Sequence, residues 1–137
     1  MIIAIDGPAG AGKSTVTRKL AERLDFMFLD TGAMYRAVTL VALENEVPLD
    51  DNEKLAEIAK TIELRFDGDT VFIDGQDKTK EIRTREVTRK IKSVADAVEV
   101  REHLVALQRR IASTGDFVSE GVIKELLRFQ KPIARFF

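Results

Sequence analysis

The sequence has 137 residues and a mass of 15.4 kDa, which is the size of one ordinary domain. Apolar residues make up 45% and charged residues 33%, a balance that excludes a disordered tail or a fibre. The 22 basic and 23 acidic residues give a net charge of -1, so we expect no nucleic-acid or membrane partner. Without cysteine, a cationic signal or an apolar run of ~20 residues, the chain is predicted to be cytoplasmic.

The first thirty residues predict a strand, a helix and a second strand. The β-branched run 2–5 ahead of a glycine cluster is typical of a buried strand. Val16, Leu20 and Leu24 recur every four residues and predict an amphipathic helix over 13–24 with these residues as its apolar stripe. A second apolar run, 26–29, completes a unit whose strands we expect to be parallel with a right-handed crossover.

Two further helices and a small meander follow. Helical spacing over 34–43 ends before Pro48, and Asp50 with Glu53 has the form of a capping box for the next helix. The apolar period then changes to two over 62–73, and this stretch and its end carry Asp-Gly turn signals. This pattern predicts a small antiparallel sheet set between helices.

The second half of the chain is predicted to be mostly helical. Thr84 caps one helix, and Asp96 with Glu99 caps a longer one that Gly115 stops. Residues 117–119 form a strand candidate, and 122–130 is helix-like up to a proline. We therefore assign three core strands, in an α/β fold with a parallel sheet flanked by helices.

The segment between the first strand and the first helix has the pattern of a phosphate-binding loop. Glycine-rich backbone can aim many N–H donors at one phosphate chain, and the following helix adds its positive end. Lysine would bridge the β- and γ-phosphates of a nucleotide, and the serine hydroxyl would bind Mg²⁺. The alternative is a glycine-rich turn with an incidental lysine. The nucleotide-binding residues predicted here are Gly7, Pro8, Ala9, Gly10, Ala11, Gly12, Lys13, Ser14 and Thr15.

A second polar segment follows the second predicted strand directly. Ligands of a parallel sheet collect beyond the carboxyl ends of its strands, so this segment should face the crevice of the phosphate loop. Thr31 offers a hydroxyl, and Arg36 offers a planar fork suited to a phosphate. The alternative is that Asp30 or Thr31 caps a helix and Arg36 is a solvated side chain.

The sequence resembles the bacterial cytidylate kinases in segments 7–15, 29–40, 81–84, 100–102 and 107–109. The core of the second segment, Asp-Thr-Gly-Ala-Met-Tyr-Arg, is characteristic of that family. The resemblance implies a P-loop fold whose antiparallel meander belongs to the monophosphate-binding insert. It also implies a transferase of pyrimidine metabolism that moves the γ-phosphoryl of ATP to CMP or dCMP with Mg²⁺.

Carried onto this sequence, the resemblance assigns the acceptor site. Thr31 and Arg36 would contact the CMP phosphate and sugar, and Arg101 would supply a second cation. Lys13 and Arg36 are the predicted catalytic residues. The family has a cytosine-reading serine near the position of Lys92, where this sequence reads Lys92-Ser93, so either Ser93 takes this role through a local shift or the contact is missing.

The resemblance covers the chain to about Gly121, where the family usually continues with Arg-Asp and this sequence continues with Val-Ile. A sheet of three strands would leave one edge exposed. The terminal phenylalanines would cover this edge or form a dimer contact through it. We expect a monomer. Without a recognisable arginine-bearing lid, turnover should be impaired. We expect one truncated kinase domain with a phosphate-loop core (1–60), the insert (61–100), a return to the core (101–121) and an atypical C-terminal segment (122–137).

Two alternatives to an active cytidylate kinase stay open. One is a catalytically silent fragment whose phosphate loop still holds a nucleotide. The other is a GTPase or another small-molecule kinase that shares only the loop. A GTPase would need a guanine-reading Asn-Lys-x-Asp segment, and this sequence has none.

Overall fold

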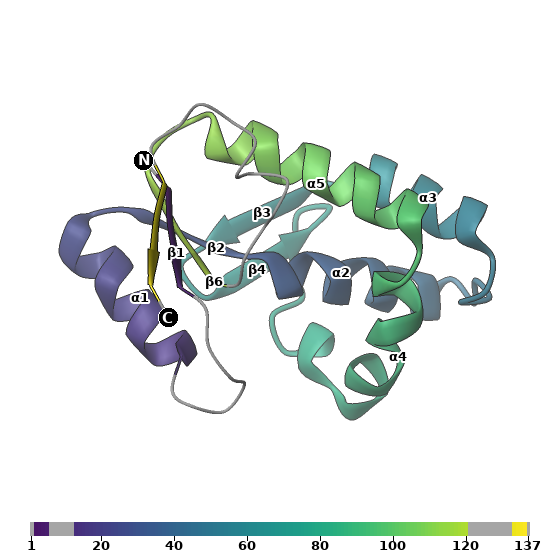
Figure 1. Ribbon diagram of the computed structural model, residues 1–137. Coiled ribbons are helices and arrows are strands. Elements are labelled where there is room, and N and C mark those ends of the chain that lie inside the picture. Colours follow the sequence, from purple (N-terminus) through teal and green to yellow (C-terminus); the bar gives the residue numbers. More distant parts are fainter. Residues whose placement is uncertain (1, 6–12, 121–132, 137) are drawn as a thin grey trace. The chain divides into compact units, whose positions relative to one another are not determined.

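The computed structural model describes residues 2–5, 13–120 and 133–136 (Figure 1). Contacts group the chain into two compact units, a first unit of Met1–Thr31 with Gln108–Phe137 and a second unit of Gly32–Leu107. The described elements, in chain order, are β1 (Ile2–Ile5), α1 (Lys13–Leu24), β2 (Met27–Asp30), α2 (Thr31–Glu44), α3 (Asn52–Thr61), β3 (Leu64–Asp67), β4 (Thr70–Ile73), β5 (Gln76–Asp77), the 3-10 helix η1 (Glu81–Arg83), α4 (Arg85–Ala95), α5 (Val98–Ala112), β6 (Phe117–Glu120) and β7 (Ile133–Phe136).

The first unit is built on a four-stranded sheet with the order β2-β6-β1-β7. Every pairing in it is parallel, which confirms the predicted α/β class. β6 lies between β1 and β2, so α1 connects two strands that are parallel but not neighbours. The predicted helix over 122–130 lies outside the described residues.

The expectation of three core strands is wrong. Residues 133–136 form a fourth parallel strand, β7, with Ile2 opposite Ile133 and Ile5 opposite Phe136. β7 pairs with the edge of β1 that β6 leaves open. Of the two roles expected for the terminal segment, covering the edge or forming a dimer contact, the structure shows the first. The run Ile-Ala-Arg-Phe carries no strong strand pattern, and its strand form is defined by its pairing with β1.

The apolar stripe predicted for α1 is not the face that the helix buries. Thr17 and Ala21 are 0% and 3% exposed, whereas Val16 and Leu24 are 57% and 41% exposed. Four residues turn a helix by about 400°, so a strict four-residue repeat drifts by about 40° at each step. The ends of the predicted stripe therefore leave the core, and Ala21 packs there with Val118 of β6.

Ser119 of β6 is a buried polar residue in this sheet. It is 1% exposed, and its Oγ has no hydrogen-bond partner within the described ranges. In the register of the sheet it lies between Ala4 of β1 and Leu29 of β2. A buried hydroxyl without a partner costs about 1–3 kcal/mol of desolvation, so this side chain destabilises the sheet.

Replacing Ser119 with alanine is therefore expected to stabilise the protein by about 1 kcal/mol and to raise the thermal midpoint by roughly 2–5 °C. The measurement is thermal unfolding followed by circular dichroism. The matched control is Ser113→Ala, because the Ser113 Oγ donates to the carbonyl of Arg110 at 2.7 Å, and its loss should not raise the midpoint. A lower midpoint for Ser119→Ala would contradict the assignment of an unpartnered hydroxyl.

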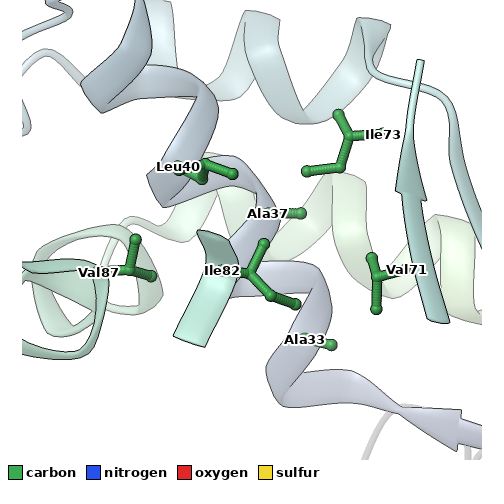
Figure 2. Close-up of a cluster of buried hydrophobic side chains, with 7 residues drawn as sticks. All are labelled: Ala33, Ala37, Leu40, Val71, Ile73, Ile82 and Val87. Atoms are coloured by element: carbon green, nitrogen blue, oxygen red, sulfur yellow. The ribbon is translucent and has the colours of Figure 1, made fainter. Parts of the chain in front are cut away.

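The second unit contains the predicted meander as an antiparallel sheet in the order β3-β4-β5. Its turns use the expected residues, with Gly68 at φ +58° and Gly75 at φ +81°, in the left-handed region that favours glycine. Figure 2 shows the buried cluster of this unit, in which α2, β4, η1 and α4 all contribute. Its fully or nearly buried members are Ala33, Ala37, Leu40, Val71, Ile73, Ile82 and Val87.

Hydrogen bonds also fix the exit of this meander. Asp77 Oδ1 accepts from the hydroxyl and the backbone N–H of Thr79 at 2.6 and 3.0 Å. These bonds favour the charged carboxylate and hold the pKa of Asp77 below its ordinary value. The Thr79 hydroxyl in turn accepts from the N–H of Val71, which ties the end of the meander to β4.

Two of the predicted helix caps are wrong, and each error has a local cause. The cap of α3 is Asp51, whose Oδ1 accepts from the N–H of Lys54 at 3.1 Å; Asp50 lies one residue too early. Asp96 ends α4 and does not begin α5, because its N–H donates to the carbonyl of Lys92. The predicted Thr84 cap of α4 is confirmed.

Among the described residues, the structure contains no helix long and apolar enough to cross a membrane.

Candidate functional site

The carboxyl ends of three strands are aligned at one edge of the sheet in the first unit. Glu120 of β6 lies opposite Ile5 of β1 on one side and Asp30 of β2 on the other. In parallel α/β sheets, ligands bind beyond this edge. Asp30 and Glu120 thus lie at neighbouring strand ends.

α1 begins at Lys13, a short distance along the chain from this edge. Lys13 and Ser14 are therefore the first two residues of a helix, where backbone N–H groups have no partner within the helix and the dipole is positive. Thr15 has an exposed side chain. The other predicted loop residues, Gly7, Pro8, Ala9, Gly10, Ala11 and Gly12, lie outside the described residues, so their phosphate-binding conformation stays a prediction.

α2 begins at Thr31, directly after β2, and not at residue 34 as predicted. Thr31 is half-buried and belongs to the first turn of the helix. The helix therefore begins at the carboxyl edge itself, with its backbone donors near the end of β2. The role of Thr31 as a ligand-binding residue stays a prediction.

Arg36 lies on α2 with a half-buried side chain. Its Nη1 donates to the carbonyl of Ile82 at 3.2 Å and to the hydroxyl of Thr88 at 2.9 Å. The guanidinium thus joins α2 to η1 and α4. The sequence pattern gave no indication of these partners, because η1 was not predicted and both contacts join distant parts of the chain.

Arg101 lies on α5 with an exposed side chain, and its Nη2 donates to the carbonyl of Ala95 at 3.0 Å. It therefore holds the last residue of α4, whereas Arg36 holds Thr88 near the start of that helix. The two contact points are about 10 Å apart along the axis of α4. The two guanidiniums are therefore held at different parts of α4.

α4 runs without interruption from Arg85 to Ala95, and Lys92 and Ser93 are both exposed on it. A regular helix places Ser93 about 100° around the axis from Lys92. The local shift that would bring Ser93 to the position of Lys92 is not present in this helix.

A parallel sheet with one helix that begins directly after β2 at its carboxyl edge, and another that begins at a lysine and a serine, is consistent with the fold of the nucleoside monophosphate kinases. The sequence model of the cytidylate kinase family matches residues 3–122. The chain belongs to the cytidylate kinase family.

Individual relatives agree with this assignment. The chain is 50% identical over 119 residues to a cytidylate kinase of Caldanaerobacter subterraneus, a match that covers 87% of this chain and 53% of the relative. It is 51% identical over 123 residues to that of Lysinibacillus sphaericus, covering 87% and 55%. For the cytidylate kinase of Desulforamulus reducens the match is 49% over 138 residues, covering 98% and 62%. The chain thus spans about half the length of the first two relatives.

Proposed function

We propose that this chain carries the nucleotide-binding chemistry of a kinase that transfers the γ-phosphoryl of ATP to CMP or dCMP, giving CDP or dCDP. The observation that carries this proposal is the family match over residues 3–122, together with a helix that begins at the lysine and serine of the phosphate-loop motif. The relatives named above are cytidylate kinases, and this chain spans about half of their length.

On the donor side, the N-terminus of α1 fits a nucleoside triphosphate. Its backbone donors and its positive dipole end favour phosphate oxygens. We assign to Lys13 the β- and γ-phosphates and to Ser14 a magnesium ligand, with Thr15 beside them. Bound Mg²⁺ would neutralise charge on the same phosphate oxygens.

On the acceptor side, we assign the CMP phosphate to Thr31 and Arg36, with Arg101 as the second cation. Positive charge around the acceptor offsets the repulsion between two phosphate groups and orients the attacking oxygen. We assign the first phosphate contact to Arg36, whose Nη1 is held by Ile82 and Thr88. Arg101, which is exposed, is assigned the second contact.

A second candidate function is nucleotide binding without turnover. This function needs only the phosphate-loop motif and the helix that begins at it, whereas turnover also requires several groups that neutralise transition-state charge together. The division into a core of 1–60, an insert of 61–100, a return to the core over 101–121 and a segment of 122–137 stays a prediction, as does the monomeric state.

One experiment separates the two candidates. The full chain is incubated with ATP, Mg²⁺ and CMP, and CDP is measured in a coupled assay, while calorimetry measures the binding of CMP and of ATP. Formation of CDP supports the kinase, and binding of both nucleotides without CDP supports the silent form. A chain that binds neither nucleotide contradicts both candidates. Parallel titrations with dCMP and UMP define the acceptor preference.

A further inference from the structure

The guanidinium of Arg36 is held from one side. Its Nη1 donates both of its hydrogens within the second unit, to the carbonyl of Ile82 and to the hydroxyl of Thr88. Within the described part of the chain, Nε and Nη2 have no hydrogen-bond partner. This second edge of the planar group carries two parallel N–H donors, the arrangement that binds a phosphate or carboxylate in a bidentate manner.

The partners of Nη1 leave the positive charge of Arg36 uncompensated. A backbone carbonyl and a hydroxyl are neutral acceptors, so neither forms an ion pair with the guanidinium. No carboxylate pairs with Arg36 in the described ranges. These bonds therefore orient the side chain, and no acidic partner neutralises its positive charge. The whole charge is available to an anion.

The three groups that form this contact are attached to one packed cluster. Ile82 is itself a member and is 0% exposed, Arg36 is followed by Ala37 at 0%, and Thr88 is preceded by Val87 at 1%. Figure 2 shows Ala37, Ile82 and Val87 gathered in this cluster from α2, η1 and α4. Packed cores of this kind are close to rigid, so the backbone positions of donor and acceptors are fixed before any ligand arrives.

We propose that Thr88 is a positioning residue for the acceptor nucleotide. It fixes the plane of the Arg36 guanidinium so that the Nε–Nη2 edge, and not the Nη1 end, binds the phosphate of CMP. The inference rests on the proposed function, in which Arg36 binds CMP. Orienting a long side chain in advance lowers the entropy that binding must remove, so the hydroxyl strengthens binding without touching the ligand.

The test compares Thr88→Val with Thr88→Ser in the full chain by calorimetry. Valine keeps the shape and removes the acceptor, and we expect it to weaken CMP binding about tenfold and to change ATP binding less than twofold. Serine keeps the acceptor and should stay within about twofold of the parent protein. Cytidine, which lacks the phosphate, should compete equally well in both variants, because only the phosphate contact depends on the orientation of Arg36.

Thr61→Val is the matched control. It makes the same change on α3, where the hydroxyl donates to the carbonyl of Glu57 in its own helix, and it should leave CMP affinity unchanged. Unchanged CMP affinity in Thr88→Val, or equal losses for CMP, cytidine and ATP, overturns the positioning role while the proposed function stands. A parent chain that does not bind CMP overturns the proposed function, and the positioning role with it.

Discussion

Replacing Lys13 with alanine is expected to lower CDP formation about a thousandfold, the largest effect of any single substitution in this chain. The lysine is the assigned cation for the β- and γ-phosphates, where negative charge is concentrated as the phosphoryl group leaves. The first turn of α1 should still form, because alanine favours a helix at least as well as lysine does. The measurement is the coupled assay, with ATP binding and thermal unfolding recorded on the same preparation.

Lys19→Ala is the control for this substitution. Lys19 lies on the same helix with an exposed side chain, so its loss removes an equal charge away from the helix N-terminus. Activity and ATP affinity should stay close to those of the parent protein. If Lys13→Ala unfolds the protein, or if both lysine variants lose activity equally, the lysine at the start of α1 does not have the assigned role.

Replacing Arg36 with alanine should have the second largest effect, a loss of CMP affinity of roughly a hundredfold, equivalent to about 3 kcal/mol. ATP affinity should change little, because the phosphate-loop motif is on a different segment of the chain. The substitution also removes the two hydrogen bonds to Ile82 and Thr88, so a stability loss of about 1 kcal/mol should accompany it. Calorimetry well below the unfolding transition separates the two effects.

Two further variants test whether the charge or the planar shape of the Arg36 side chain accounts for the lost CMP affinity. Arg36→Lys keeps the charge and loses the planar fork, and it should recover only part of the CMP affinity. Arg89→Ala removes an exposed cation from α4 and should leave CMP binding within about twofold. Equal losses of CMP and ATP affinity in Arg36→Ala would move this arginine out of the acceptor site.

The sequence predicted most of the fold where the signal is local. A β-branched run before glycines, helical spacing and Asp-Gly turns identified β1, α1 and the meander. The errors lie where local signals compete. Asp50 and Asp51 are both good caps, and only the position of the first free N–H selects the second. The sequence analysis did not predict β7, because its strand form depends on pairing with the distant β1 and not on its own four residues.

In the candidate site, too, the sequence predicted the features that depend on a local motif and missed those that depend on tertiary packing. The lysine and serine at the start of α1, and a threonine directly after β2, follow from a motif read beside a predicted strand. The partners of Arg36 could not be predicted, because its contacts with Ile82 and Thr88 depend on how three separate elements pack. The positions of Arg36 and Arg101 at different ends of α4 are likewise a product of tertiary structure.

The pairing of β1 has a consequence for biosynthesis. This strand is made before the second unit, and both of its partners, β6 and β7, emerge from the ribosome only after that unit. The second unit is one continuous stretch and is free to fold as it emerges. An apolar strand must therefore wait with both edges unpaired until the second unit has been made, and unpaired edges of this kind are prone to pair with other chains.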